Sequence, residues 1–497
     1  MENIAQTIAK ETSLGYFAKL FKKFPQAKAY LVGGMVRDII LGRPSKDYDF
    51  VISGVKPATL EKFLKSLGRV DLVGKTFGVF KFQPKDSVLG EPIDIALPRT
   101  EHSLYLAGGY REFAVKTDYQ MPIEEDLLRR DFTINALAWD LKRKKLIDPT
   151  GGLSDLAAGI IRAVGQAEKR FQEDYSRILR GLRLAIQLRF TFESKTWQAT
   201  KAMIGFLNNS KLPREIVARE LLKSFEADAV RAFDVFELSG VFRTLIPELL
   251  HLKDCQQGPE YHSEGDVWTH TRLALERLFS PMFHKHFPGE KPDLELILAT
   301  LFHDLGKPYT RKLRLNHHLS FYGHEQVGGE LAFDIAERLR LSSYQGKVDS
   351  SHLAWLIHYH LIITHTSPIK FNRATFEKYF LEPTLGQKLL QLIFADQAAS
   401  LSMEGEPSLK NFYDAVELTK EIKRIGYEKK KQPKILLNGR DIMTRLKLKP
   451  GPRIGEIIHQ LRATQLRGKI RTKKQALGFL DRQYGNKIHS RKKRRTA

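Results

Sequence analysis

Aspartates near the start of the chain have the spacing that divalent-metal chemistry requires. Asp47 and Asp49 lie two residues apart in DYDFVI, a segment typical of a β-strand, and Asp94 lies in the later strand-like segment PIDIAL. Side chains two apart on a strand point to one face, so Asp47 and Asp49 can share a cation. Three such carboxylates suit two Mg²⁺ ions, one lowering the pKa of an attacking hydroxyl and one holding a triphosphate. The pair alone also fits a solvated strand edge.

A double glycine, Gly33 and Gly34, follows the strand-like segment AYLV. Residues without a Cβ let backbone N–H groups approach phosphate oxygens closely, although an ordinary turn also explains them. GKT at 74–76 resembles the end of a P-loop, but the preceding Gly68 lies one residue too far upstream. We therefore expect phosphate binding at the double glycine and not at GKT.

The segment EDYSR carries a carboxylate and a guanidinium that can read a nucleotide base. Asp174 and Arg177 lie three apart in a predicted helix and so on one of its faces, where an intrahelical salt bridge is the alternative. A carboxylate only accepts and a guanidinium only donates, which matches an exocyclic amine beside an unprotonated ring nitrogen. Cytosine and adenine present that edge. A wrong base would leave buried groups unpaired, at a cost of roughly 10⁴ in selectivity.

Histidines and aspartates gather in the helical segment 255–400. A lone histidine on a helix is usually a structural residue, so only the pattern carries weight. Mixed imidazole and carboxylate ligands suit Mn²⁺, Ni²⁺, Fe²⁺ or Mg²⁺, and a bound metal could activate water against a phosphate ester. The residues are His262, His270, His303, Asp304, His324, His358, His360 and Asp396.

Two kinds of structure must position these residues. Within 28–150 the segments AYLVGG, DYDFVI, GVFKF and PIDIAL are short, apolar and bounded by Gly, Pro or charged residues, which predicts strands there and nowhere else. From about Leu153 apolar residues recur three and four apart, as in ILRGLRLAIQLRF, which predicts helices almost to the end. The predicted fold class is therefore α+β, a strand-rich head followed by helices.

The composition favours a polyanionic partner. Lys and Arg number 81 against 57 Asp and Glu, a formal net charge of +24, and a basic surface attracts nucleic acid. The run Arg491–Arg495 predicts a solvated tail that adds RNA affinity. The single cysteine, Cys255, excludes a disulfide framework. With no signal-peptide core and no long apolar run, we expect a cytoplasmic protein without a membrane partner.

Several motifs together resemble the family of class II tRNA nucleotidyltransferases and bacterial poly(A) polymerases. They are GGMVRDIILGRPSKDYDF, VGKTFGVFKF, PIDIALPRTE, EEDLLRRDFTINALAWD and FQEDYSRILRGLRLA, in family order over roughly 28–225. The resemblance implies a polymerase-beta-like head with a mixed sheet, in which Asp47 and Asp49 bind Mg²⁺ and Asp94 assists. It also implies nucleotide-binding roles for Gly33, Gly34, Arg37, Arg130, Asp131, Asn135, Asp174, Arg177 and Arg180. Taken alone, RRDFTIN also fits a helix N-terminus capped by Asp131.

The resemblance covers two reactions, CCA addition to tRNA and poly(A) addition. Phe77, Gly78 and Val79 in GKTFGVF are similar to the CCA-adding group, as is Thr76. In CCA enzymes a loop such as 98–118 is associated with the switch from C to A addition, although a plain surface loop is the alternative. We therefore expect template-independent addition of CTP and ATP to the tRNA acceptor end. A poly(A) polymerase is the alternative, and no DNA partner is expected.

The histidine pattern, with LFHDLGKP at its centre, resembles the HD-domain phosphohydrolases. The resemblance implies His270, His303, Asp304 and Asp396 as principal ligands of a transition metal such as Ni²⁺ or Mn²⁺, with Lys307 placed to neutralise charge. A second metal would use His324 and His360. Activity on 2′,3′-cyclic phosphate or 2′-phosphate ends would follow. The alternatives are a domain kept only for tRNA docking, or a protein that is mainly a phosphohydrolase with an RNA-binding head.

The expected domains follow from these motifs and from turn-rich boundaries at PTGG, GlyPro 258–259 and GYEKKKQPK. They are a nucleotidyltransferase head at 1–155, an all-α neck and body at 156–250, an all-α HD domain at 251–410 and a helical C-terminal region with a basic tail at 411–497. The segment LLNGRDIMTRLKLKPGPRIGEIIHQL also resembles the C-terminal part of enzymes that carry an HD domain.

Overall fold

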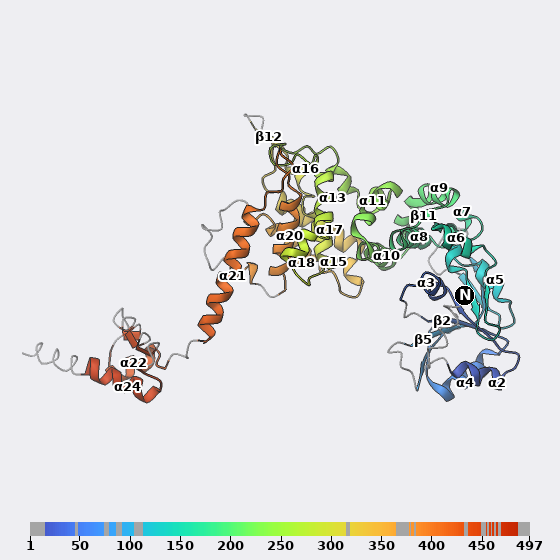
Figure 1. Cartoon of the computed structure of the whole chain (residues 1–497), viewed down its shortest axis with the longest axis horizontal. Helices are drawn as coiled ribbons and strands as arrows, with labels where there is room; N and C mark the ends of the chain where they lie inside the picture. Colours follow the sequence, from blue (N-terminus) through green and yellow to red (C-terminus); the bar gives the residue numbers. More distant parts are fainter. Residues whose placement is uncertain are drawn as a thin grey trace, which may run out of the picture. The chain divides into compact units, whose positions relative to one another are not determined.

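The computed structural model describes most of the chain, in segments separated by gaps. The described residues are 15–44, 48–73, 79–85, 92–103, 113–314, 319–363, 377, 379–381, 384–431, 436–448, 454, 457–458, 460–461, 464–465 and 469–485. The chain divides into two compact units, one formed by Met1–Phe371 with Glu382–Phe412 and one by Asn372–Leu381 with Tyr413–Ala497. Figure 1 shows the elements of each unit. Among the described residues, no helix combines the length and apolar composition that a membrane crossing requires.

The head of the first unit is built on a mixed sheet of seven strands, which confirms the predicted α+β class. The strand order is β3-β4-β5-β2-β1-β8-β9. Strands β2 and β5 pair in parallel, and the other neighbours pair antiparallel. A separate antiparallel pair is formed by β6 (Arg99–Ser103) and β7 (Phe113–Thr117). The sheet strands are β1 (Lys28–Val32), β2 (Asp49–Ser53), β3 (Gly68–Val73), β4 (Val79–Pro84), β5 (Ile93–Ala96), β8 (Ala138–Asp140) and β9 (Lys145–Ile147).

The central strands are buried along almost their whole length. In β1 and β2 only the first residue is exposed, which is why KAYLV and DFVIS read as nearly continuous apolar runs. Helix α2 (Tyr16–Lys23) packs on this sheet, with the Phe17 ring 4.7 Å from that of Phe50. The other helices of the head are α3 (Gly34–Ile40), α4 (Pro57–Leu67) and α5 (Ile123–Leu128).

The chain becomes helical from Gly152, close to the position that the apolar periodicity predicts. Helix α8 packs against α10, and the aromatic rings of α11 and α12 join the same core, for example Phe233 and Phe242 at 5.6 Å. The elements are α6 (Gly152–Ala158), α7 (Ala167–Glu173), α8 (Ser176–Leu188), α9 (Ser194–Met203), η3 (Ile204–Asn208), α10 (Arg214–Ala227), α11 (Ala229–Ser239), α12 (Val241–Leu245) and η4 (Pro247–Leu252).

The helices that carry the histidine cluster follow in the same unit. Their starts are well specified, because Asp266, Asp293 and Asp349 each accept a hydrogen bond from a backbone N–H in the first turn of the helix that follows. The elements are α13 (Val267–Arg277), α14 (Pro281–His286), α15 (Leu294–Phe302), α16 (Lys307–Thr310), α17 (His324–Leu339), η5 (Leu341–Ser343), α18 (Ser350–Tyr359) and α20 (Gly386–Ala399).

Strands also occur outside the head, which corrects the prediction that they cluster only within 28–150. β10 (Ile160–Ile161) pairs with β11 (Thr191–Phe192), and β12 (Lys312–Leu313) pairs with β13 (Leu319–Ser320). Each is two residues long. A pairing this short leaves no alternating pattern in the sequence, so only the tertiary structure could reveal it.

The second unit has its own apolar core. Leu437, Ile442, Leu446, Ile457 and Leu480 are among its buried residues. Helices α22 (Gly439–Leu446) and α24 (Lys473–Leu480) both start with a capping box, and a turn of π-helix follows at Asp481–Gly485. Helix α21 (Lys410–Lys431) begins in the first unit. The predicted basic tail at Arg491–Arg495 lies outside the described residues.

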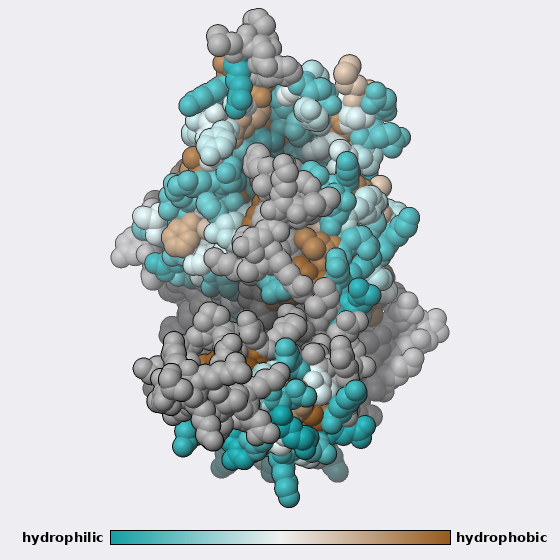
Figure 2. Space-filling view, turned by 90° about the vertical axis from the view of Figure 1, so that its left-hand side faces the viewer, coloured by the Kyte–Doolittle hydropathy of each residue, from teal (hydrophilic) through white to brown (hydrophobic). Residues whose placement is uncertain are grey.

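The surface fits the charged composition. On the face drawn in Figure 2 most described side chains are hydrophilic, and the apolar ones form small, separate groups. Small exposed apolar groups of this kind are normal on a protein surface.

Candidate active sites

The carboxylates of the head lie side by side on two parallel strands. Asp49 is the first residue of β2, and its register partner on β5 is Asp94. Lys81 on β4 is in turn the partner of Asp94. Partner residues on neighbouring strands point to the same face of a sheet, so the three side chains form one row. All three line a cavity of about 1040 Å³. Asp47 lies outside the described residues, so its part in this row stays a prediction.

The double glycine closes the turn between β1 and α3. Gly33 has φ of +73°, and a Cβ on it would lie 2.8 Å from the Nη1 atom of Arg130. Only glycine fits there without strain. Its backbone N–H donates to the Leu137 carbonyl at 3.2 Å, so this donor is not free for a phosphate oxygen, contrary to the sequence-based expectation. Gly33 instead lets the Arg130 guanidinium reach the cavity that both glycines line.

The predicted nucleotide-binding residues of α3, RRDFTIN and α8 form one hydrogen-bonded network. Arg37 Nη1 donates to Asn135 Oδ1 at 2.7 Å, and Asn135 Nδ2 donates to Asp131 Oδ1 at 3.3 Å. Arg180 Nη1 donates to Asp131 Oδ2 at 3.0 Å. Arg37 also pairs with Asp38. The network therefore fixes two arginines at the wall of the cavity, which all five residues line.

Asp131 is not a helix cap, which was the alternative interpretation of RRDFTIN. The short helix η2 (Thr133–Asn135) is preceded by Phe132 and has no side-chain cap. Burial by itself would raise the pKa of Asp131, but the guanidinium groups of Arg180 and Arg177 outweigh it and hold that pKa below its ordinary value. Asp131 is therefore a buried anion that orients Arg180.

The base-reading pair is arranged differently from the prediction. Asp174 is not helical: it ends α7 in an extended conformation, and Arg177 is the second residue of α8. The two residues therefore do not share a helix face, because the helical conformation is interrupted between the end of α7 and the start of α8. Arg177 pairs with Glu173, and Asp174 Oδ1 accepts from the Ser176 N–H at 2.9 Å. Both residues nevertheless line the same cavity.

One buried carboxylate of the head was not foreseen. Asp126 on α5 has none of its surface exposed. It accepts from Arg129 Nε at 3.0 Å and from Arg130 Nη2 at 3.4 Å, and the backbone N–H of Arg99 points to it at 3.4 Å. The three arginines line the cavity. The i, i+3 and i, i+4 spacing in EEDLLRRD was the available sequence signal.

The histidine cluster is assembled from residues on or next to five helices, and the four predicted principal ligands come from three of them. His270 lies on α13, His303 and Asp304 follow α15, and Asp396 lies on α20. His270 Nε2 is 3.1 Å from Asp396 Oδ1, and His303 Nε2 is 3.2 Å from Asp304 Oδ2. The Nε2 atoms of the two histidines are 3.3 Å apart. The structure thus brings the four predicted principal ligands together.

The predicted second-metal residues join the same cluster through Asp304. His324, the first residue of α17, places Nε2 3.3 Å from Asp304 Oδ1. His360, which directly follows α18, groups with both: one ligand atom from each of Asp304, His324 and His360 lies within 4.8 Å of the others. Asp304 forms an equivalent group with His270 and His303. His358, by contrast, is exposed.

Backbone carbonyls orient the imidazoles of this cluster. The Nδ1 atoms of His303, His324 and His360 each bond the carbonyl three residues earlier, at 2.8, 2.7 and 2.6 Å. A neutral imidazole that donates through Nδ1 presents an unprotonated Nε2, and that is the atom that binds metal. These hydrogen bonds therefore hold the three rings in an orientation that suits metal binding through Nε2.

Unsatisfied buried atoms show that this donor set fits a metal. The Nε2 atoms of His324 and His360 are buried and make no hydrogen bond within the described segments. Such atoms are rare in native proteins unless a bound ion or water completes them. Burial alone would raise the pKa of Asp304, but His303 and Lys307 hold it well below its ordinary range, so Asp304 is an anion. Imidazole and carboxylate together are typical ligands of a divalent transition metal.

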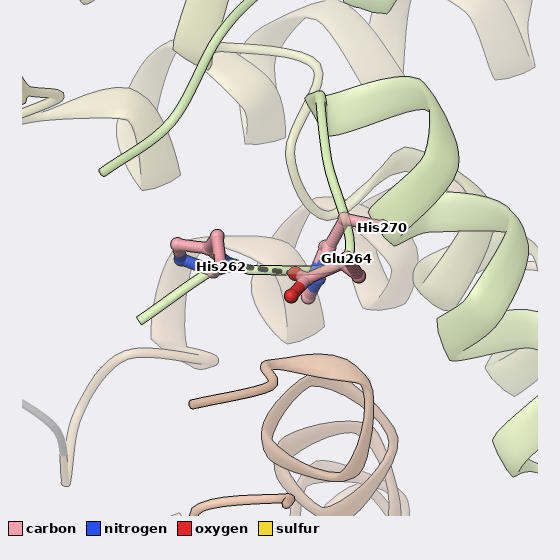
Figure 3. Close-up of side chains that lie close together, drawn as sticks. All are labelled: His262, Glu264 and His270. Carbon is pink, nitrogen blue, oxygen red and sulfur yellow. Dashed lines mark hydrogen bonds and ion pairs between the residues drawn. The ribbon is translucent and has the colours of Figure 1, made fainter. Parts of the chain in front are cut away.

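A glutamate that the sequence did not single out holds His270. Figure 3 shows Glu264 between His262 and His270, with both rings turned toward its carboxylate. Glu264 Oε1 is 2.8 Å from His270 Nδ1 and 2.7 Å from His262 Nδ1. Its Oε2 accepts from the backbone N–H of Leu401, just beyond α20. Glu264 therefore orients His270 and joins the segment before α13 to the segment after α20, the helix that carries Asp396.

The comparisons with known proteins match the segments of the chain that carry both candidate sites. Models of three families match the chain: the poly A polymerase head domain at 29–162, the HD domain at 266–396 and a putative tRNA nucleotidyltransferase domain 2 at 413–480. A "Multifunctional CCA protein" of Neisseria meningitidis is 34% identical over 385 residues, or 76% of this chain and 84% of the relative. One of Nitrosococcus oceani is 37% identical over 320 residues, or 64% and 72%.

Solved structures show the same fold. The CCA-adding enzyme of Bacillus stearothermophilus in complex with CTP is similar with a TM-score of 0.53 and 20% identity, covering 97% of this chain and 100% of that one. The CCA-adding enzyme of Thermotoga maritima, complexed with tRNA, is similar with a TM-score of 0.53 and 21% identity, covering 96% and 98%.

Fold and sites together define a nucleotidyltransferase with an HD domain in the same chain. Within that class, the family is identified by the sequence identity of the curated relatives and by the large share of both chains that the matches cover. The chain belongs to the family of multifunctional CCA proteins.

Proposed function

We propose that this chain adds C and A to the 3′ end of tRNA from CTP and ATP, without a nucleic-acid template. The observation that carries the proposal is that one cavity is lined both by the acidic row of Asp49 and Asp94 and by the base-reading pair of Asp174 and Arg177. A single cavity can therefore hold a triphosphate at one end and select its base at the other. The family membership favours CCA addition over poly(A) addition.

The head residues have distinct roles in this proposal. Asp49 and Asp94, with Asp47, would hold Mg²⁺. When bound, Mg²⁺ lowers the pKa of the attacking 3′-hydroxyl and neutralises charge on the triphosphate. Arg37, Arg130 and Arg180 orient the nucleotide. Catalysis then depends mainly on positioning and on stabilising charge in the transition state.

Asp174 and Arg177 would select the base. The carboxylate accepts from an exocyclic amine and the guanidinium donates to the adjacent ring nitrogen, which fits cytosine and adenine and leaves uracil and guanine unmatched. Because the pair sits at the break between α7 and α8, its geometry depends on two elements and not on one helix face. This separation allows the two side chains to approach a base from different directions.

The test is incubation of the purified chain with tRNA transcripts that end before CCA, supplied with single nucleotides and with pairs. We expect two C residues from CTP, a terminal A only when ATP is also present, and no use of UTP or GTP. Long tails from ATP alone on any RNA would favour the poly(A) alternative. Asp49→Ala should abolish every addition.

The second proposed activity is phosphoester hydrolysis by the HD domain. His270, His303, Asp304 and Asp396 would hold a transition metal such as Ni²⁺ or Mn²⁺, and His324 and His360 would complete a second site with Asp304. A bound metal supplies an activated water. The substrates would be RNA ends that carry 2′,3′-cyclic phosphate or 2′-phosphate. His303→Ala should remove hydrolysis and spare nucleotide addition, the reverse of Asp49→Ala.

A cytoplasmic location is part of the proposal. The lone thiol, Cys255, is buried, and burial raises its pKa, so it is a poor nucleophile. A free, unreactive cysteine fits a reducing compartment, where tRNA is the substrate at hand. Fractionation of cells that express the tagged chain would test the location.

A further inference from the structure

Gln257 lies in the loop before α13 and is 6% exposed. Its Oε1 accepts a hydrogen bond from Lys307 Nζ at 2.6 Å. A lysine ammonium can only donate, so the amide oxygen must face Lys307 and the amide NH₂ must point elsewhere. The hydrogen-bond chemistry thus fixes the orientation of this carboxamide.

The NH₂ group of Gln257 makes no hydrogen bond to any residue that the structure describes, although the atom is buried. A buried donor without an acceptor is destabilising, and native proteins seldom keep one. The acceptor that satisfies this donor must therefore come from outside the described chain.

The surroundings show which kind of acceptor fits. Lys307 begins α16, three residues after Asp304, and its Nζ forms an ion pair with Asp304 Oδ2 at 2.7 Å. Asp304 in turn belongs to both groups of metal ligands. An ammonium carries three N–H donors, so Lys307 can face Asp304 and Gln257 and still offer one to a ligand. One ammonium and one oriented amide donor therefore lie together beside the metal ligands.

We propose that the Gln257 carboxamide, held by Lys307, donates a hydrogen bond to a phosphate oxygen of the substrate of the HD domain. The ligand class is a phosphate ester or its product, inorganic phosphate. This inference rests on the phosphohydrolase function proposed above. The donor pair offsets the repulsion that the carboxylates of Asp304 and Asp396 exert on a phosphate, and makes Gln257 a residue that determines substrate affinity.

Two substitutions separate donation from charge. Gln257→Glu keeps the size and the acceptor for Lys307 but replaces the NH₂ by an oxygen. Gln257→Met is neutral, has a similar length and offers no donor. In the full chain loaded with Mn²⁺, inorganic phosphate binding is measured by calorimetry, and hydrolysis is measured with bis(p-nitrophenyl) phosphate. Mn²⁺ affinity is measured separately by chelator competition.

Both variants should bind phosphate about tenfold or more weakly, with a matching rise in KM and a smaller change in kcat, because a hydrogen bond to a charged group is worth roughly a factor of ten or more. Mn²⁺ affinity should stay within a factor of about two in Gln257→Met. Nucleotide addition by the same preparations should be unchanged, which shows that the chain is folded.

Wild-type phosphate affinity in both variants would overturn the inference, and so would a loss of phosphate binding that only parallels a loss of Mn²⁺ binding. If the wild-type chain with Mn²⁺ neither binds phosphate nor cleaves the diester, the phosphohydrolase proposal itself fails. That result differs from an active wild type with unaffected variants, which would refute the role of Gln257 alone.

Discussion

At the scale of single residues, both sites hold buried charges in place through neighbours of opposite charge or through fixed hydrogen bonds. Asp131 is held by Arg180 and Asn135, and His270 is held by Glu264. Breaking such a pair leaves an uncompensated buried group, which costs far more than the pair contributes by itself. Substitutions of residues such as Glu264 and Asp131, which orient their neighbours, should therefore alter binding at the site.

Glu264→Gln should weaken metal binding by the HD domain roughly 10- to 100-fold, since loss of a carboxylate that orients a histidine ligand has an effect of that size. Chelator competition with Mn²⁺ measures it. Glu276→Gln, at an exposed position of helix α13, which also carries His270, is the matched control and should leave the affinity unchanged. Equal affinities for Glu264→Gln and the wild type would contradict the orienting role.

Asp131 should make part of the stability of the head dependent on pH. Its folded pKa lies below the ordinary value of 3.8, so its ionisation stabilises the fold above that pH. The contribution is lost as the pH falls through the lower, folded value. Asp131→Asn should therefore be less stable than the wild type at pH 7, and the difference in Tm should shrink below about pH 4. A difference in Tm between the variant and the wild type that does not shrink at acid pH would refute this.

At the scale of elements, the nucleotide-binding cavity depends on close packing between helix α8 and the RRDFTIN segment. Gly181 on α8 faces Phe132, the residue that follows Asp131, and a Cβ on Gly181 would lie 2.6 Å from the Phe132 ring. This close approach brings the part of α8 that carries Arg177 and Arg180 against the RRDFTIN segment. The glycine is thus a packing requirement of the nucleotide site.

Gly181→Ala should destabilise the chain by about 1–3 kcal/mol, because overpacking forces neighbouring groups to shift. It should also raise KM for CTP and ATP, since Arg180 moves relative to Asp131. Urea unfolding and steady-state kinetics measure the two effects. Gly205→Ala is the control, because a Cβ there would meet nothing within 4 Å. A variant as stable and as active as that control would show that Phe132 adapts freely.

At the scale of the whole molecule, the excess of 81 basic over 57 acidic residues predicts strong, salt-sensitive RNA binding. The run Arg491–Arg495 should contribute, so truncation after Gly485 should weaken tRNA binding. The slope of log Kd against log salt should fall by roughly 0.7 to 0.9 for each phosphate that the tail neutralises in the full chain. Filter binding over a range of salt concentrations measures the slope. An unchanged affinity and slope would show that the tail binds no phosphate.

The amino-acid sequence predicts the kind of chemistry at the two candidate sites. The residue types, the order of the motifs and the family resemblance singled out Asp49 and Asp94, the arginines of the head cavity and the histidine–aspartate cluster as candidate site residues, because metal and base recognition require particular functional groups at particular points of the chain. Apolar periodicity likewise predicted a strand-rich head followed by helices. These features are local, so they can be read from neighbouring residues.

Other features of the two candidate sites appear only in the folded chain. Asp174 lies outside a helix, and the N–H of Gly33 donates to the Leu137 carbonyl. Glu264 and Gln257 lie beside the histidine cluster. The two-residue strands β10 to β13 belong to the same class of finding. The contacts between Gly33 and Leu137 and between Gln257 and Lys307 join segments far apart in the chain, and the spacing of neighbouring residues carries no information about such contacts.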